Sequence, residues 1–296
     1  MYILEPVIHE TIWGGNRILH NSDGKKIGHL YMVNGHNGLS NIIVNGEDKG
    51  KTLRQLFDIK KKDWNMDCFT DFPLTIALVD ASDNLSIQVH PDDKTAEKLE
   101  GAKIGKKESW IFLSAPYEGW IYAGCNCQTV DEIKQAVESG KTESVVEHLS
   151  IKENDYVCVS AGTLHAMTKG SLVYEIEYGS DFTYRFYDYN RTDETGKKRE
   201  LHIQRALQSV RPSLKTNVKT CSIDSDCDED VYVVQRKDVS AGYKNNTNTV
   251  ECISVLNGSG KMDGVYIKTG MSILLSPDET LPKNDFSDVV IARLNR

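Results

Sequence analysis

The sequence predicts an all-β protein that is interrupted by a small helical excursion. Short runs rich in β-branched and aromatic residues recur along the 296 residues, each bounded by Gly, Asn, Asp or Pro. Such runs are typical of the strands of a sandwich or barrel. Helical periodicity is confined to a few short segments, and a weak internal repeat indicates that one strand arrangement occurs twice.

Nine runs have the composition and boundaries of strands. They are LSIQVHP (85–91), SWIFLSA (109–115), GWIYAG (119–124), DYVCVSAG (155–162), SLVYEIEYG (171–179), TYRFYDY (183–189), DVYVVQR (230–236), VECISVLNG (250–258) and MSILLSP (271–277).

Three segments have helical signals: 51–59, 92–100 and 129–140. In the last of them Thr129 precedes the helix and Glu132 follows three residues on, which is the spacing of an N-terminal capping box. We expect ESVVEHLSI, at 143–151, to form a second helix. The helical excursion then covers about 129–150.

The internal repeat aligns residues 151–165 with 267–281 at a constant offset. Both segments have the pattern of a strand, a turn and a loop of small residues. The alignment places His165 on Leu281, so only the first copy keeps the histidine.

The segment 213–230 is polar, rich in aspartate and nearly free of apolar residues, so it is predicted to link two blocks, 1–212 and 231–296. Calcium binding is an alternative for this segment, but it lacks the central glycine and the closing glutamate of a calcium loop.

The charge balance argues against nucleic acid or an anionic membrane as the main partner, because 43 acidic residues face 35 basic ones and the net charge is −8. No apolar run reaches the length of a membrane span, and the start MYILEPVIHETIWGG lacks a basic region before an apolar one. We therefore expect a cytoplasmic protein.

An odd number of cysteines, seven, favours reduced thiols over a disulfide framework. Thiolate metal ligation by Cys125, Cys127 and Cys158 is an alternative, although the CxC pair lacks a matching second pair.

Gln88 and His90 lie two residues apart on a predicted strand, so both side chains leave the same face while Val89 points the other way. That geometry suits two ligands of one ion. Asp92 and Asp93 follow directly and are expected to cap the next helix rather than to take part in chemistry.

Two further donors complete a possible metal set. Glu108 stands at the entrance to the apolar strand of GKKESWIFL, and His165 follows the glycine turn of SAGTLH. Taken alone, each residue has a simpler interpretation, an exposed glutamate beside two lysines and a structural histidine. Together with Gln88 and His90 they make two nitrogen and two oxygen donors, a mixture that zinc accepts.

This pattern resembles the metal signature of the cupins, with glutamine in place of one histidine and Ser160 in place of a proline. It resembles more narrowly the type I mannose-6-phosphate isomerases, in their short bacterial form, along the whole chain. The matching motifs are IWGG (12–15), LSIQVHPDD (85–93), GKKESW (105–110), SAGTLHAM (160–167) and YEIEYGSDFTYRFYDYNR (174–191).

The resemblance implies two cupin-like jelly-roll barrels, a metal-bearing catalytic one within 1–212 and a smaller metal-free one within 231–296. It also implies one zinc ion per chain and the interconversion of mannose 6-phosphate and fructose 6-phosphate through a metal-stabilised enediolate. The residues that match the family's zinc ligands are Gln88, His90, Glu108 and His165. Arg185 matches the active-site arginine, and Lys106 matches the lysine two residues before the glutamate.

Arg185 is expected to bind phosphate or to stabilise the enediolate. The structural alternative for Arg185 is an ion pair with Asp181 or Asp188. Lys106 is expected to transfer protons or to bind phosphate.

One motif departs from the family. Where relatives have an IGExWE-like segment, this chain has IGHLYMV at 27–33, with His29 and Tyr31 in place of the usual Glu and Trp. A non-catalytic cupin that binds sugar phosphate as a sensor therefore stays open, as does an iron cupin oxygenase, and His29 is an alternative extra ligand. The candidates for the general base are Glu175, Glu177, Asp181 and a metal-bound water.

Overall fold

The fold is predominantly β, as predicted, and the computed structural model describes residues 1–19, 24–36 and 38–296. The chain forms two compact units. The terminal unit comprises Met1–His9, Leu30–Leu78 and Thr220–Arg296, and the central unit comprises Glu10–His29 and Val79–Lys219. The all-β prediction is confirmed, but the sheets are open rather than closed into barrels.

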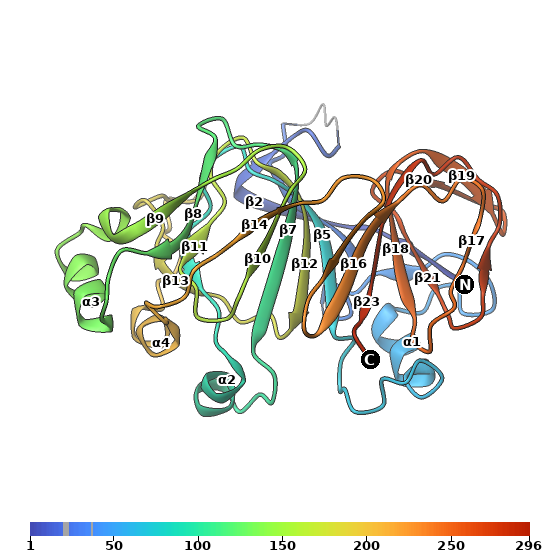
Figure 1. Ribbon diagram of the computed structural model, residues 1–296, viewed down its shortest axis with the longest axis horizontal. Coiled ribbons are helices and arrows are strands. Elements are labelled where there is room, and N and C mark those ends of the chain that lie inside the picture. The colour runs from blue at the N-terminus through green and yellow to red at the C-terminus, as the bar shows by residue number, and fades with distance from the viewer. Residues whose placement is uncertain (20–23, 37) are drawn as a thin grey trace. The chain divides into compact units, whose positions relative to one another are not determined.

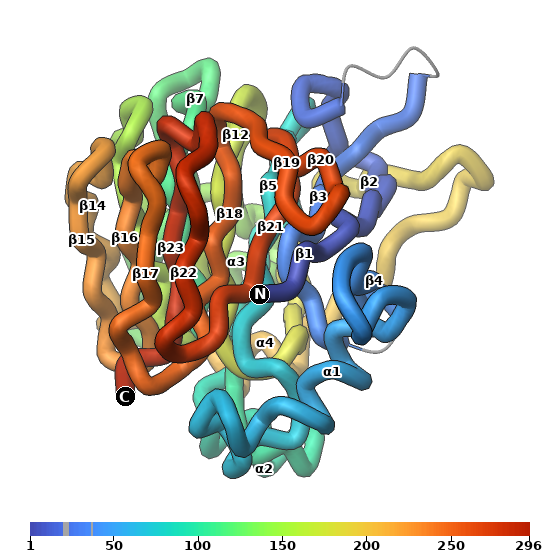
Figure 2. Tube along the Cα trace, turned by 90° about the vertical axis from the view of Figure 1, so that its right-hand side faces the viewer, coloured from blue at the N-terminus to red at the C-terminus, as the bar shows by residue number. Residues whose placement is uncertain are grey.

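The terminal unit contains a 7-stranded sheet of order β15-β16-β23-β18-β21-β1-β4, whose main strands lie across Figure 2 in that order. Two short ribbons, β17-β22 and β19-β20, belong to the same unit. The strands are β15 (Ser225–Asp228), β16 (Tyr232–Lys237), β23 (Asp288–Leu294), β18 (Glu251–Asn257), β21 (Ser272–Leu275), β1 (Tyr2–Glu5), β4 (Ile42–Ile43), β17 (Tyr243–Lys244), β22 (Thr280–Leu281), β19 (Ser259–Met262) and β20 (Val265–Lys268).

A second 7-stranded sheet has the order β14-β10-β7-β12-β5-β3-β2, and a 5-stranded sheet has the order β13-β6-β11-β8-β9. Their strands are β14 (Val218–Thr220), β10 (Asp155–Val159), β7 (Lys106–Ser114), β12 (Leu172–Gly179), β5 (Leu74–Asp80), β3 (Ile27–Val33), β2 (Val7–Gly15), β13 (Tyr184–Tyr187), β6 (Ile87–Val89), β11 (His165–Ala166), β8 (Trp120–Cys125) and β9 (Val146–Ser150). All nine predicted strand runs are confirmed.

The helices are α1 (Leu53–Lys60), α2 (Asp93–Glu100), α3 (Val130–Glu138), α4 (Ile203–Ser209) and the 3₁₀ turn η1 (Thr142–Val145). The predicted caps at Asp92 and Thr129 are confirmed: the Asp92 carboxylate accepts a hydrogen bond from the Thr95 amide, and the Thr129 hydroxyl accepts one from the Glu132 amide. Asp93 is not a cap, because it is the first residue of α2 and its carboxylate accepts from the Gly105 amide. Ile133 of α3 and Ala206 of α4 pack with β6, β8 and β11 in one apolar cluster (Figure 1).

The second predicted helix, at 143–151, is wrong. After the 3₁₀ turn the chain forms β9, which pairs with β8 so that His148 lies opposite Tyr122. The His148 ring also stacks on Trp120, with ring centroids 3.7 Å apart and planes inclined by 4°. Strand pairing and aromatic packing override the local helical propensity here.

The units differ from the predicted division at 212 because the N-terminal strands belong with the C-terminal ones. β1 pairs with β21, so that Ile3 lies opposite Ile273, and both side chains enter the apolar core of the terminal unit. A unit boundary at Lys219 and Thr220 falls inside the predicted linker 213–230. That linker is not featureless, since it contains β14 and β15.

Within the part of the chain that the structure describes, no helix is both long and apolar enough to cross a membrane.

Candidate metal centre and active site

Three of the predicted site residues lie side by side across the 5-stranded sheet of the central unit. His165 of β11 is the register partner of Gln88 in β6, and Gln88 is in turn the partner of Arg185 in β13. Directly opposed residues of antiparallel strands project from the same face. The pairing therefore aligns an arginine, an amide and an imidazole that are far apart in sequence.

The other site residues come from β7 and its neighbour β12. Lys106, Glu108 and Trp110 alternate along β7 and project from one face. On β12, Glu177 lies opposite Glu108 and Glu175 lies opposite Trp110. Two acidic residues thus join the lysine and glutamate that the sequence predicted.

A glycine turn precedes His165, as predicted from the motif SAGTLH, and it also contacts His90. Gly162 has φ +91, and a Cβ there would lie 2.6 Å from Cγ of Arg211. Its amide donates a hydrogen bond of 2.9 Å to the carbonyl of His90. Glycine at this position therefore permits the loop before His165 to approach the strand end at His90.

Three side chains converge as metal-ligand candidates: His90, Glu108 and His165. Nε2 of His90 lies 3.0 Å from Oε2 of Glu108, and Nε2 of His165 lies 3.2 Å from Oε1 of the same carboxylate. Each of the three residues is only 1% exposed.

Backbone carbonyls fix the tautomers of both imidazoles. Nδ1 of His90 lies 2.8 Å from the carbonyl oxygen of Phe182, and Nδ1 of His165 lies 2.9 Å from that of Thr163. A carbonyl only accepts, so Nδ1 bears the proton and Nε2 presents a lone pair. Burial first, and then the charge of Lys106, lowers the pKa of His90 to about 4, which keeps that ring neutral near pH 7.

The donor set fits a divalent cation. Two imidazole lone pairs face a carboxylate, and Nε2 of His90 and Oε1 of Glu108 are buried without a hydrogen-bond partner. Such groups repel one another unless a cation lies between them, and nitrogen with carboxylate oxygen is a donor set that zinc accepts.

Gln88 stands next to this set. Its Nε2 lies 3.4 Å from Nε2 of His165, while its Oε1 accepts from the Ser86 hydroxyl at 3.2 Å. Rotation of the amide by half a turn exchanges the two atoms and would direct the oxygen to the cation. Ligation by Gln88 stays a prediction.

Lys106 links the metal candidates to the acidic strand. Its Nζ lies 2.6 Å from Oε1 of Glu177 and 3.4 Å from Oε2 of Glu108. Burial by itself would lower the pKa of Lys106, but the carboxylates of Glu177 and Glu108 outweigh it and raise the pKa above its ordinary value. The lysine is therefore a fixed positive charge.

Glu175 is a buried carboxyl group that favours its neutral form, whereas Lys106 favours its charged form. Burial, followed by the carboxylates of Glu177 and Glu108, raises the pKa of Glu175 well above its ordinary value. The Trp110 indole donates a hydrogen bond of 3.0 Å to its Oε1. Glu175, Glu177 and Glu108 each place an oxygen within 4.8 Å of the others, so they form a second acidic group that shares Glu108 with the metal donors.

The unusual residue His29 lies beside this second group. Its Nε2 is 3.9 Å from Oε2 of Glu175, and its ring makes an edge contact with Trp13 at a centroid distance of 5.1 Å. His29 is not in either candidate metal group of the described residues.

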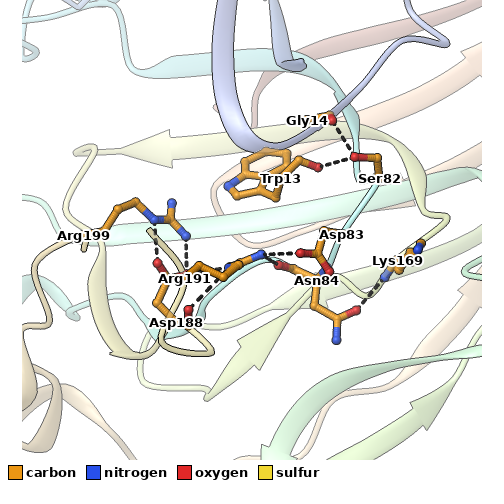
Figure 3. Close-up of polar contacts among 9 residues, drawn as sticks. All are labelled: Trp13, Gly14, Ser82, Asp83, Asn84, Lys169, Asp188, Arg191 and Arg199. Carbon is orange, nitrogen blue, oxygen red and sulfur yellow. Dashed lines mark hydrogen bonds and ion pairs between the residues drawn. The ribbon is translucent and has the colours of Figure 1, made fainter. Parts of the chain in front are cut away.

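Arg185 has no anionic partner among the residues that the structure describes, and its Nε is buried without an acceptor. The neighbouring Asp188 is already engaged: Arg191 and Arg199 both direct their guanidinium groups at it (Figure 3), with Nη2 of each 2.5 Å from Oδ1. Burial and then the charge of Arg199 lower the pKa of Arg185. The predicted alternative of a pair with Asp188 is therefore not present, and Asp181 is exposed.

The IWGG motif is anchored within the same unit. The Ser82 hydroxyl oxygen lies 3.1 and 2.5 Å from the carbonyl oxygens of Trp13 and Gly14 (Figure 3), which share its single proton. The strand that bears Trp13, and with it the edge contact to His29, is thereby fixed through its backbone.

Two alternatives receive no support in the described ranges. All seven cysteines are free thiols, and neither candidate metal group includes Cys125, Cys127 or Cys158. The candidate groups also exclude the aspartates of 213–230.

The sequence interpretation missed Trp110 and the roles of Phe182 and Thr163. Alternation along β7 places Trp110 on the face of Glu108, so that residue was accessible to sequence reasoning. The two carbonyls that orient the histidines have no signature in side-chain chemistry.

Open antiparallel sheets that bring two histidines and a glutamate together define a cupin-type protein with a candidate metal centre. Residues 1–107 match the family described as phosphomannose isomerase type I, catalytic domain. The chain is 34% identical over 272 residues to the probable mannose-6-phosphate isomerase GmuF of Bacillus subtilis, covering 88% of this chain and 86% of that protein. It is also 33% identical over 214 residues to the mannose-6-phosphate isomerase ManA of the same organism, covering 71% and 68% of the two chains.

The crystal structure of the mannose 6-phosphate isomerase from Bacillus subtilis superposes with a TM-score of 0.84 at 28% identity, covering 99% of both chains. The chain belongs to the type I phosphomannose isomerase family.

Proposed function

We propose that this protein is a metal-dependent aldose-ketose isomerase that interconverts mannose 6-phosphate and fructose 6-phosphate. The observation on which this rests is the convergence of His90, Glu108 and His165 in a member of this family. Arg185, whose Nε is buried without an acceptor, lies across from Gln88 in the same sheet as His165. The substrate is a small hexose phosphate. Neither nucleic acid nor a membrane is an expected partner, and the oligomeric state stays open.

We assign one zinc ion per chain to His90, Glu108 and His165, with Gln88 as the fourth ligand. A bound divalent cation with an open position would polarise the sugar carbonyl and stabilise the enediolate charge, a contribution of several kcal/mol to the barrier. The rigid Nδ1 hydrogen bonds of both histidines support this assignment, because they hold each Nε2 in place before the ion binds.

Arg185 is assigned to the anionic part of the substrate. Its guanidinium lies on the same face as Gln88, and its Nε is buried without an acceptor. A half-buried guanidinium whose Nε has no acceptor favours an incoming anion, since the anion would supply the missing hydrogen bond and balance the charge. The phosphate and the enediolate oxygens are the two anionic groups that the reaction offers.

Proton transfer is assigned to the acidic residues of β12. Glu175 and Glu177 lie near Glu108, whereas Asp181 is exposed. Lys106 binds Glu177 at 2.6 Å and so orients that carboxylate while adding positive charge next to the reacting oxygens. Of the candidates from the sequence, Glu175 and Glu177 are the preferred bases.

His29 is assigned to substrate preference. It borders Glu175 at 3.9 Å, so the family's usual acidic residue is replaced by an imidazole within reach of a proton-transfer candidate. The cytoplasmic location expected from the sequence stays a prediction.

A coupled assay tests the proposed function. Zinc-loaded protein is mixed with mannose 6-phosphate, and the appearance of fructose 6-phosphate is followed through an auxiliary enzyme. His165→Ala is the matched control, because it should lose metal and turnover together. If the parent protein binds mannose 6-phosphate and zinc but forms no fructose 6-phosphate, it is a sugar-phosphate sensor and the isomerase proposal fails.

A further inference from the structure

The terminal unit repeats the strand order of the central unit. Strands β6 to β12 of the central unit have counterparts β17 to β23 of the terminal unit in the same sequence order. The pairings also correspond. In the sheet order, β7 lies between β10 and β12, just as β18 lies between β21 and β23. Likewise, β11 pairs with β6 as β22 pairs with β17, and β8 pairs with β9 as β19 pairs with β20. The repeat predicted at 151–165 and 267–281 is one part of this correspondence.

The register identifies the counterpart of the metal-site glutamate. Val159 of β10 lies opposite Glu108 of β7, and the repeat aligns Val159 with Leu275. Leu275 of β21 lies opposite Glu251 of β18. The terminal unit therefore keeps a glutamate at the position that corresponds to Glu108.

The other ligand positions have changed. His165 pairs with Gln88, and its counterpart Leu281 pairs with Tyr243. Two residues beyond Tyr243, at the position that corresponds to His90, stands an asparagine, Asn245. At the positions that correspond to the two histidines, the terminal unit therefore has Asn245 and Leu281, whose side chains do not bind zinc.

Glu251 is nevertheless deeply buried, with 1% of its surface exposed. The Tyr243 hydroxyl donates to its Oε1 at 3.2 Å, and Nε of Arg293 lies 3.5 Å from the same oxygen. Oε2 has no hydrogen-bond partner. Burial raises the pKa of Glu251 above its ordinary value in spite of these partners.

Arg293 comes from the strand that pairs with β18. Cys252 lies opposite Ala292, so the register places Arg293 across from Glu251, at the position that corresponds to Glu177 in the central unit. The position that corresponds to Lys106, two residues before the glutamate, is Thr249, which is buried and has an unpaired hydroxyl. The positive charge has thus moved from the lysine position to the opposite strand.

We propose that the terminal unit contains a converted second metal centre, in which the guanidinium of Arg293 takes the place of the ion beside Glu251. A carboxylate at this depth requires a compensating cation. The central unit offers a ligand set for a divalent ion, whereas the terminal unit lacks both imidazoles and places an arginine against the corresponding glutamate. The converted site holds no metal as it stands, and restoring the two imidazoles while removing the arginine would make it bind one.

The first experiment reopens the site with the triple change Asn245→His, Leu281→His and Arg293→Met. After zinc loading and removal of free ion, elemental analysis should find one more equivalent of zinc per chain than in the parent protein. Adding Glu251→Gln to the triple variant is the matched control and should abolish the extra equivalent. A folded triple variant that binds no more zinc than the parent overturns the proposal. Because only the difference from the parent is used, the result does not depend on the first site.

A second experiment keeps the proposal testable if the triple variant does not fold. Arg293→Met alone leaves a buried carboxylate without its cation, whereas Glu251→Gln with Arg293→Met removes both charges. The urea midpoint of the single variant should therefore fall below that of the double variant. If the double variant is as unstable as the single one, or less stable, Arg293 is not the counter-charge and the proposal fails.

Discussion

The two units place different chemistry on equivalent strands. In the central unit Trp110 and Glu175 face each other across β7 and β12, and the glutamate accepts the indole hydrogen bond. In the terminal unit the corresponding residues are Ile253 and Ile291, which face each other across β18 and β23 in an apolar core. At this pair of positions one strand arrangement thus holds an ionisable residue in the central unit and two apolar residues in the terminal unit, so the function depends on the site residues and not on the fold.

His165 and Leu281 make the same point at one position. Both are almost completely buried, at 1% and 0% exposure. The histidine requires a carbonyl acceptor at Nδ1, supplied by Thr163, whereas the leucine requires only apolar neighbours such as Ile273 and Leu275. Burial alone therefore does not separate a ligand from a core residue; the polar partners do.

The largest expected difference in zinc content and turnover is between variants of the two corresponding glutamates, Glu108 and Glu251. Glu108→Gln removes the charged oxygen donor and should lower the zinc content, with a fall in kcat/KM of about 10³-fold because several kcal/mol of stabilisation are lost. Glu251→Gln should leave zinc content and turnover close to the parent values. Elemental analysis and the coupled assay measure both. Equal losses in the two variants would contradict the functional difference between the units.

Arg185→Ala should retain zinc and lose activity by about 10²-fold, because one positioned donor to the developing anion is removed. The control is Arg205→Ala, which removes an exposed guanidinium 3.4 Å from Glu100 on the same unit and should have little effect. Steady-state kinetics and zinc analysis distinguish the two. Normal turnover in Arg185→Ala would refute its catalytic assignment.

Leu281→Ala should cost about 2–5 kcal/mol of stability, because truncation leaves a cavity in an apolar core. Zinc bound per folded chain should not change, in contrast to His165→Ala. Urea denaturation and elemental analysis provide the two readouts. A loss of zinc from folded Leu281→Ala would show that the leucine position still serves the metal centre.

The smallest effect concerns pH. The folded-state pKa of Glu251 is raised above the ordinary 4.5, so its protonated form favours the folded state. This contribution to the free energy of unfolding is fully present below pH 4.5 and is lost as the pH rises through the folded-state pKa of Glu251. The free energy of unfolding of the metal-free parent, relative to Glu251→Gln, should therefore decrease as the pH rises above 4.5. An increase over that range would contradict the pKa direction.

Most residues of the candidate site were accessible to sequence reasoning because they follow strand periodicity. Gln88 lies on β6 and His90 follows directly after the end of that strand, while Glu108 lies near the start of β7. Gly162, with a φ of +91, marks the turn before His165. Local patterns of this kind depend only on neighbours in the chain. The same reasoning failed for β9, since its conformation depends on pairing with β8 and on the stacking of His148 on Trp120.

The sequence by itself determined the all-β class, the donor types and the family resemblance, because strand alternation, turn residues and side-chain chemistry are local properties. Only the tertiary structure decided that His90, Glu108 and His165 meet, that carbonyls of Phe182 and Thr163 orient the imidazoles, and that residues 1–9 and 30–78 belong with 220–296. These features arise from pairing between distant strands and from burial of charge, neither of which is encoded within a single segment of the chain.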